Sequence, residues 1–417
     1  MTSASREKAT LPGRGGAAQG FFMEFWSVMN PFLFLRGEFR RSWGGALALA
    51  LVLALAGSLS PAVSLMERAI RSGMASSADA FDLVVGAKGS AVDLVLGTVY
   101  LRPEALSLLP AGTLEEVKAH GGIRWAAPLA FGDRWRNYPI AGTSSELVNL
   151  GGRRPLASGR MFLTPGEAVV GAGVPLKEGD SFMPSHGSVA EAALDEGGSS
   201  HAHDHPFRVV GKMPATGTPW DRAIVVPIEA LWKMHGAGEG RCSAVVVKPV
   251  TVADAYRLRA ALNGRDTQAV FSGEVLTRLF GTLEEVQRVM LMLTFAAQAA
   301  ALAAALVSGF FAVAMRVKSL ALLRALGASH AFLAVSVWLM VSGVMLAGCL
   351  LGLGLGCFMA SAASAWIQAE TGVALAVSLS AKECLAALFA FACGSAAAAL
   401  PACFACRRAA GEILRSA

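Results

Sequence analysis

The chain has 417 residues, of which 54% are hydrophobic and 16% are charged, and its formal net charge is +6. Soluble domains usually carry about 25% charged residues, and the mean hydropathy of +0.52 is too high for one of this length. The composition excludes collagenous, disordered and disulfide-framework proteins and indicates an integral membrane protein.

The N-terminal region, residues 1–41, is predicted to be cytoplasmic. Its first 20 residues are rich in Gly, Ala and Ser, which predicts a disordered start. Aromatic residues then gather in residues 21–39, ahead of a basic cluster. This segment fits either a helix lying on the inner membrane surface or a helix buried against the spans.

Four uncharged stretches are long enough to cross a bilayer. The first covers residues 42–66; a cleavable signal peptide is the alternative, but the preceding polar region and the apolar run are both too long for one. The other three spans are predicted at residues 289–315, 331–358 and 384–406. Small residues after the third span predict an extracytoplasmic hairpin over residues 359–383.

Lys and Arg residues are distributed unevenly around these spans. They concentrate in residues 1–41, in residues 316–330 and in the tail, residues 407–417, whereas the loop before the fourth span contains only Lys382. Because basic residues stay on the cytoplasmic side, both termini are predicted to be cytoplasmic and residues 67–288 extracytoplasmic.

Residues 67–288 mix helix and strand patterns. A capping box at Thr113 and Glu116 predicts a helix that ends at Gly121, and residues 252–262 and a segment from Glu274 predict further helices. Strands are predicted at residues 123–128, 167–171, 207–211, 244–248 and 268–271. The predicted fold is therefore a membrane α-helical protein with four transmembrane helices and a large α+β extracytoplasmic domain inserted between helices 1 and 2. A small split sheet with helices on one face is expected.

Several kinds of chemistry are absent from the sequence. No G-x-x-x-x-G-K-[ST] loop is present, so the chain has no phosphate-binding loop of its own. The span interiors contain essentially no ionisable residue, unlike those of ion-coupled carriers, and Ser185 and His186 are adjacent rather than arranged as a triad. The chain is not expected to be an enzyme, and no nucleic-acid partner is expected.

The loop after the second span, residues 316–330, has the pattern of an amphipathic helix. Three leucines share one face, two basic residues lie beside them, and a glycine can end the helix. Such a helix could bind in a partner's groove or serve as a solvated connector. The candidate residues are Arg316, Lys318, Leu320, Leu323, Arg324, Leu326 and Gly327.

A histidine-rich loop, residues 197–206, begins with a Gly- and Ser-rich lead-in, residues 197–200. Neutral imidazoles and a carboxylate at close spacing can ligate zinc or a similar metal. The candidate ligands are His201, His203, Asp204 and His205, with His186 upstream. The alternative is a solvated polar loop that binds nothing. No tightly bound cofactor is expected, and Zn²⁺ is the candidate ligand of this loop.

Gly348, Gly352 and Gly356 recur every four residues in the third span. A stripe of small residues lets another helix approach closely. It predicts tight helix packing, either within the chain or between two copies.

Together, these features resemble the permease subunits of type VII ABC transporters, the FtsX, LolC/LolE and MacB group. The resemblance covers about residues 40–417. It depends on one span, a large outer domain and three further spans, on residues 316–328 (RVKSLALLRALGA), which are similar to the family's coupling helix, and on residues 401–410 (PACFACRRAA). Residues 81–90 (FDLVVGAKGS) and 216–222 (TGTPWDR) resemble a branch that often carries a His-rich insertion.

The resemblance implies a multi-pass protein of the bacterial inner membrane whose large MacB-like domain is periplasmic. A separate ABC ATPase of the LolD/MacB type would bind at residues 320–328. The remaining implied partners are a second copy of the chain or a sister permease, the lipid bilayer, and a periplasmic substrate-handling protein.

The leading functional hypothesis is a permease that couples ATP hydrolysis by its partner to movements of the outer domain, for transport or mechanotransmission, with a link to zinc. The alternative is a regulatory membrane scaffold that activates an extracytoplasmic enzyme while nothing crosses the membrane.

Overall fold

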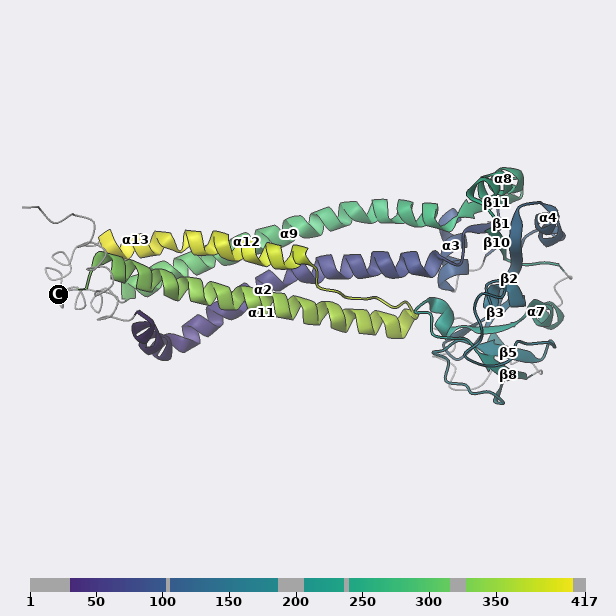
Figure 1. The fold of residues 1–417 in the computed structure, drawn as a ribbon, viewed down its shortest axis with the longest axis horizontal. Coiled ribbons are helices and arrows are strands. Elements are labelled where there is room, and N and C mark those ends of the chain that lie inside the picture. The colour runs from purple at the N-terminus through teal and green to yellow at the C-terminus, as the bar shows by residue number, and fades with distance from the viewer. Residues whose placement is uncertain (1–30, 103–105, 187–205, 236–239, 316–327, 408–417) are drawn as a thin grey trace, which may run out of the picture. The chain divides into compact units, whose positions relative to one another are not determined.

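The computed structural model describes residues 31–102, 106–186, 206–235, 240–315 and 328–407. The chain divides into two compact units. The helical unit comprises residues 1–61, 292–356 and 380–417, and the α+β unit comprises residues 62–291 and 357–379. Figure 1 shows the elements of each unit.

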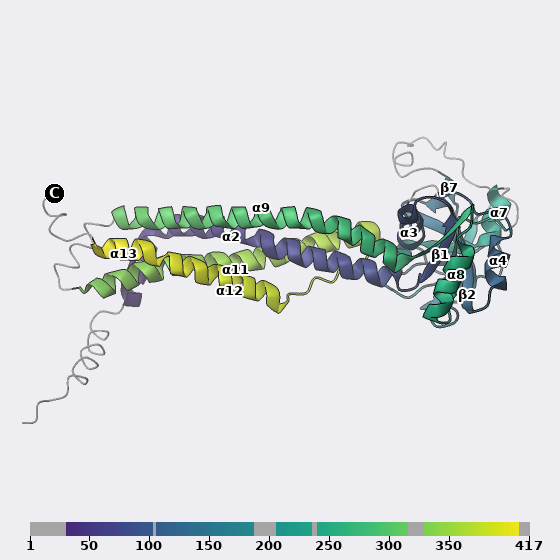
Figure 2. The same cartoon turned by 90° about the horizontal axis from the view of Figure 1, so that it is seen from above.

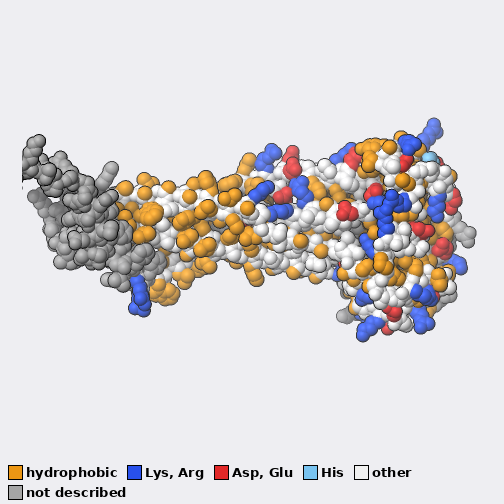
Figure 3. Space-filling model, viewed as in Figure 1, with side chains coloured by type: hydrophobic (Ala, Val, Ile, Leu, Met, Phe, Trp, Pro, Cys, Tyr) orange, Lys and Arg blue, Asp and Glu red, His pale blue; other side chains and the backbone are white. Residues whose placement is uncertain are grey.

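Four helical segments of the described residues are long and apolar enough to cross a membrane, and they confirm the four expected spans. The first three lie in α2 (Pro31–Ala78), α9 (Ser272–Met315) and α11 (His330–Thr371). The fourth, Ala381–Cys403, comprises α12 (Ala381–Ala397) and part of α13 (Ala399–Arg407). Figure 3 shows hydrophobic side chains over the surface of the helical unit, while Lys, Arg, Asp and Glu gather on the α+β unit. Phe311 and Phe389, for example, are 67% and 72% exposed, as expected for side chains that contact lipid.

Two helices extend beyond their predicted spans: α2 because a charged residue need not end a helix, and α11 because a run of small residues does not end one either. In α2, Glu67 accepts a hydrogen bond from Arg71 Nη2 at 2.8 Å, one turn further along the same helix. The predicted hairpin over residues 359–383 is wrong in its first half, since α11 continues to Thr371. Gly372, with a φ of 76°, ends α11 by donating its N–H to the Gln368 carbonyl at 2.8 Å. A non-helical linker, residues 372–379, follows.

The fourth predicted span is interrupted between α12 and α13. Pro401 explains the break, because proline has no N–H to donate to the carbonyl of Ala397 and its ring crowds that group. The core of the helical unit lies beside this break. There Trp338 Nε1 donates to the Ser395 carbonyl at 2.8 Å, which satisfies a polar group that lipid could not.

The α+β unit is built on one sheet of eleven described strands, in the order β11-β1-β10-β2-β3-β9-β5-β8-β4, with β6 beside β8 and β7 beside β2. Neighbouring strands are antiparallel except for the β3–β9 and β5–β8 pairs. The strands are β1 (Leu83–Ala87), β2 (Ile123–Trp135), β3 (Tyr138–Thr143), β4 (Ser158–Gly159), β5 (Glu167–Val170), β6 (Ser181–Phe182), β7 (Ser185–His186), β8 (Phe207–Lys212), β9 (Ile224–Pro227), β10 (Ala244–Pro249) and β11 (Thr267–Phe271).

Helices cover both faces of this sheet, so the expectation of a small split sheet covered on one face is wrong. One face packs against α4 (Thr113–Ala119), α7 (Ile228–His235) and α8 (Val252–Leu262), and the other packs against α3 (Ala91–Tyr100), α5 (Ser145–Val148) and the 3-10 helix η1 (Pro219–Arg222). Figure 2 shows α3 and α8 on either side of β1. Within β1, Val84 contributes to one core and Val85 to the other, and both are 0% exposed. Strands buried on both faces lose the alternation that marks a half-exposed sheet.

The capping box predicted at Thr113 is also wrong. The N-cap of α4 is Gly112, with a φ of 87°, and Thr113 Oγ1 donates instead to the Pro110 carbonyl at 2.7 Å. Capping boxes form at Thr251 of α8 and at Ser380 of α12. The strand predicted to end at residue 128 continues to Trp135, across a bulge between Phe131 and Asp133.

An ion pair joins two strands near one end of the sheet. Arg160, which follows β4, forms two side-chain hydrogen bonds with Glu167 of β5, one of them 2.8 Å long between Nη1 and Oε2. The Leu163 N–H donates to the same oxygen at 2.8 Å. These donors, the guanidinium first, lower the pKa of Glu167 to about 2.

Candidate functional site

Two of the predicted sites lie outside the described residues. The predicted partner-binding residues there are Arg316, Lys318, Leu320, Leu323, Arg324, Leu326 and Gly327. The predicted metal ligands there are His201, His203, Asp204 and His205. His186 is the last residue of β7, and its backbone pairs with Asp133 of β2. Among the described residues, no group of three His, Cys, Asp or Glu side chains could hold a metal ion. Both sites therefore stay predictions.

The glycine stripe of the third span lies against α2 of the same chain. A Cβ atom added to Gly348 would lie 2.6 Å from Leu53 Cβ, and one added to Gly352 would lie 3.0 Å from the Ala54 carbonyl oxygen. At Gly356 it would lie 2.6 Å from Pro61 Cγ. The packing within one chain therefore uses this stripe, as small residues at a helix interface allow.

The segment at residues 216–222 forms a closed turn around one carboxylate. Asp221 accepts hydrogen bonds from the N–H groups of Thr216 and Gly217, at 2.9 Å and 2.7 Å, and from Thr216 Oγ1 at 2.7 Å. The turn ends with η1, and β9 (Ile224–Pro227) follows after one residue. In the sheet, β9 lies between β3 and β5. We call residues 216–222 the clamp turn.

The linker after α11 contacts the clamp turn. The Ala374 N–H donates to the Gly217 carbonyl at 2.7 Å. A Cβ atom on Gly217, whose φ is 69°, would lie 2.7 Å from Ala374 Cβ, so the close approach requires glycine. Arg222 donates a side-chain hydrogen bond to the Ala369 carbonyl near the end of α11. The end of α11 and the central sheet are thus joined through a few direct contacts.

The same linker packs on the end of α2. Ala69 of α2 is buried together with Val373 and Leu375 of the linker. A Cβ atom on Gly73 would lie 2.8 Å from the Ala374 carbonyl oxygen. Nearby, the Tyr100 hydroxyl donates to the Met74 carbonyl at 2.8 Å, and burial raises the pKa of this tyrosine. Two long helices and the sheet therefore meet at residues 372–379.

The start of α9 is fixed to the α+β unit by charge. Glu274 accepts hydrogen bonds from Arg259 of α8 at 2.6 Å and from Arg278 at 2.8 Å. Further along α9, Glu284 lies 3.7 Å from Arg71 of α2. Surface pairs of this kind are individually weak, so they help to align the helices within this unit more than they stabilise it.

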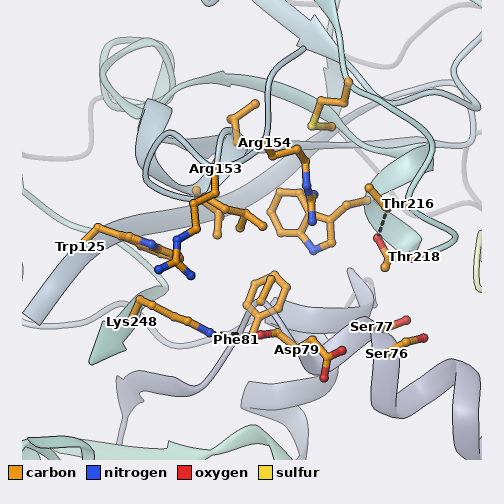
Figure 4. Close-up of a pocket in the computed structure, with 16 residues that line it drawn as sticks. Ser76, Ser77, Asp79, Phe81, Trp125, Arg153, Arg154, Thr216, Thr218 and Lys248 are labelled. Carbon is orange, nitrogen blue, oxygen red and sulfur yellow. Dashed lines mark hydrogen bonds between the residues drawn. The ribbon is translucent and has the colours of Figure 1, made fainter. Parts of the chain in front are cut away.

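A cavity of about 450 Å³ opens in the α+β unit beside the clamp turn. Figure 4 shows its labelled residues: Arg153 and Arg154 extend from one loop toward Phe81 on the opposite wall, with Lys248 and Asp79 on the side of Phe81. Sequence reasoning missed this site. Local signals were the adjacent arginine pair directly after Gly151 and Gly152, and residues 81–90 and 216–222, which contribute Phe81, Thr216, Thr218 and Trp220. They could not be combined from the sequence, because the lining comes from segments far apart in the chain.

Comparisons with known proteins give a distant likeness in fold. No family pattern matches the chain, and no curated protein matches it. The extracellular domain of the noncanonic ABC-type transporter YknZ from Gram-positive bacteria matches with 13% identity and a TM-score of 0.30, covering 45% of this chain and 98% of that one. The periplasmic region of MacB from Actinobacillus actinomycetemcomitans matches with 12% identity and a TM-score of 0.32, covering 47% of this chain and 91% of that one.

Proposed function

We propose that the chain is the permease subunit of a type VII ABC transporter, of the FtsX-like and MacB-like kind, in a bacterial inner membrane. The observation that carries the proposal is the continuity of three helices: α2, α9 and α11 each contribute residues to both the helical unit and the α+β unit. Helices of this kind suit a protein that passes movement along its backbone rather than one that opens a polar path through its spans.

The proposed sequence of events begins on the cytoplasmic side. A separate ATPase of the LolD/MacB type binds at residues 320–328, within the segment that connects α9 to α11, and its ATP-driven movements displace both helices. At the other end of α11, the linker and the Arg222 hydrogen bond to Ala369 pass the displacement to the clamp turn. The clamp turn is followed by β9, which lies inside the sheet between β3 and β5. A displacement of the clamp turn therefore moves the whole sheet together.

The proposed complex contains two permeases, either two copies of this chain or this chain with a sister subunit. An ATPase dimer offers two equivalent binding surfaces, and each needs a partner helix. The α+β unit is placed on the periplasmic side, where it would act on cargo or on a periplasmic substrate-handling protein.

Partner binding is tested by substitution in the predicted coupling helix. The full chain is purified from its native membrane in detergent, and the co-purifying ATPase is identified and quantified. Leu323→Asp with Leu326→Asp should abolish co-purification, because it places two charges on the apolar face. Ala321→Asp with Ala325→Asp adds the same charge on the opposite face of the predicted helix and should leave binding intact. Equal binding by both variants would show that the leucine face is not the docking surface.

We also propose that residues 201–205 bind Zn²⁺, as cargo or as a regulatory ligand. Three imidazoles and one carboxylate are a ligand set that zinc accepts. Calorimetric titration of the full chain with Zn²⁺ at pH 7.5 should show binding that is lost when His201, His203 and His205 are changed together to Ala. His120→Ala, outside the loop, is the control. Because the ligands must be deprotonated, affinity should fall as pH drops through about 6.5. Equal binding by the triple variant would remove the zinc proposal without affecting the permease proposal.

A further inference from the structure

The cavity beside the clamp turn has the size of a small-molecule site. Its volume of about 450 Å³ lies within the range of roughly 300 to 1,000 Å³ that such sites occupy. Its lining comes from the end of α2 and the residues after it, from β2, from α5 and the loop after it, from Met213 after β8, from the clamp turn and from β10. Every lining residue belongs to the α+β unit.

Positive charge exceeds negative charge at this cavity. Three cations line it, Arg153, Arg154 and Lys248, against one carboxylate, Asp79. Lys248 is already paired, since its Nζ lies 2.7 Å from Asp82 Oδ1. Among the residues that the structure describes, neither arginine side chain has a hydrogen-bond or ion-pair partner.

Arg154 is the less exposed of the two arginines. It is half-buried, whereas Arg153 is exposed. Burial lowers the pKa of Arg154, and the nearby Asp221 carboxylate only partly opposes this effect. Asp221 accepts hydrogen bonds from the N–H groups of the clamp turn, and among the described residues no hydrogen bond or ion pair joins it to this guanidinium. A half-buried guanidinium without a bonded anion is a group that a ligand's anion would stabilise.

The loop that carries the arginines is held in shape by its own hydrogen bonds. Leu150, Gly151 and Gly152 all have positive φ, of 51°, 65° and 87°. Asn149 secures both ends of this loop, since its Oδ1 accepts from the Gly152 N–H at 2.9 Å and its carbonyl accepts from the Arg154 N–H at 2.8 Å. A fixed loop reduces the entropy that binding would otherwise cost.

The remaining lining includes three aromatic side chains, Phe81, Trp125 and Trp220, beside aliphatic and hydroxyl-bearing ones. The rings of Phe81 and Trp220 lie 5.8 Å apart, and the Gly151 backbone approaches Trp125 so closely that a Cβ atom would lie 2.5 Å from Trp125 Cδ1. Trp220 is 7% exposed, and its buried Nε1 has no hydrogen-bond partner among the described residues. Aromatic faces beside cations suit a ligand that has both an apolar body and an anionic group.

We propose that this cavity binds a small organic anion, with its carboxylate or phosphate on Arg153 and Arg154 and its apolar body against Phe81, Trp125 and Trp220. The proposal does not depend on an ATPase partner or on zinc. The same chemistry is offered by a free aromatic or aliphatic acid and by the phosphodiester group of a lipid.

The test is a calorimetric titration of the full chain in maltoside micelles, which contain no phosphate group, with phenyl phosphate, a soluble anion with an aromatic body. Phenyl phosphate should bind, while benzyl alcohol, which lacks the charge, and inorganic phosphate, which lacks the ring, should each bind at least about tenfold more weakly. Arg154→Gln should weaken phenyl phosphate binding by a similar factor. Arg208→Gln removes an exposed arginine of the same unit and should have no effect.

Thermal unfolding of each variant shows whether the fold is retained, and Arg153→Gln gives a second variant if Arg154→Gln does not fold. Phosphatidylglycerol added to the micelles identifies the source: weaker phenyl phosphate binding then indicates that a lipid headgroup enters the cavity, and unchanged binding indicates a free acid. Absence of phenyl phosphate binding in micelles without added lipid would overturn the proposal. Equal binding by the Arg154→Gln, Arg153→Gln and Arg208→Gln variants would overturn it too.

Discussion

The glycine stripe of α11 offers a sharp test of helix packing, because the same helix contains a matched control. Gly356 and Gly354 are two residues apart and lie on different faces. A Cβ atom on Gly356 would lie 2.6 Å from Pro61 Cγ and 2.7 Å from the Ser58 carbonyl oxygen, whereas a Cβ atom on Gly354 would have no neighbour within 4 Å. Ala at Gly356 therefore requires α2 to move, since a backbone carbonyl and a proline ring cannot rotate away.

The expected magnitudes have opposite signs. In a helix interior, Gly→Ala is worth about 0.5–1 kcal/mol of stabilisation, and this is the whole effect expected for Gly354→Ala. At Gly356 the same gain is opposed by overpacking, which costs about 1–3 kcal/mol. The two variants should therefore differ by about 1–3 kcal/mol, with Gly356→Ala the less stable.

The assay is thermal unfolding of the purified full chain in detergent, followed with a thiol-reactive dye at one fixed heating rate. A fixed rate is needed because membrane proteins often unfold irreversibly. The unfolding midpoint should fall for Gly356→Ala and stay the same or rise for Gly354→Ala. Equal midpoints would refute the conclusion that the stripe packs against α2.

Three further outcomes follow from the α+β unit. Asp221→Ala should destabilise the full chain by at least about 2 kcal/mol, since it leaves the donors of the clamp turn unpaired. Asp221→Asn should cost less. Thermal unfolding measures both variants, and equal effects would contradict this role of the carboxylate. Glu167 has a folded pKa of about 2, below its ordinary value, so its stabilising effect is present above about pH 4.5 and is lost as pH falls toward 2. Glu167→Gln should therefore reduce the change of the unfolding midpoint with pH across that window. A variant with the same pH dependence as the wild type would contradict this role of Glu167. Gly217→Ala should speed hydrogen exchange in the linker, because its Cβ would displace Ala374. Gly152→Ala, also at positive φ but with nothing within 4 Å, should not. Equal exchange rates in the two variants would show that backbone strain, and not the contact with Ala374, changes the exchange.

The long apolar helices were predictable because their signal is local. A run of uncharged residues identifies a membrane-spanning helix with no knowledge of what it packs against. Their ends were less predictable: the ion pair of Glu67 with Arg71 continues α2 past the expected boundary, and Gly372 rather than the small residues before it ends α11.

The α+β unit was harder to predict because its order depends on distant pairing. The pattern at Thr113 and Glu116 matches a capping box as well as the one at Ser380 does, yet only the second forms, since the Thr113 hydroxyl has a carbonyl partner of its own at Pro110. The cavity was not predictable from the sequence, because its arginines and its tryptophans become neighbours only in the folded α+β unit.

Coupling between the permease and its ATPase is tested by ATP hydrolysis in nanodiscs that contain the complex of the chain with its co-purified ATPase. We predict that the permease changes the hydrolysis rate of the ATPase, that Leu323→Asp with Leu326→Asp removes this effect, and that Ala321→Asp with Ala325→Asp preserves it. An ATPase whose rate is the same with the wild-type chain, with the leucine variant and with no chain at all would show that the chain is not its coupled permease.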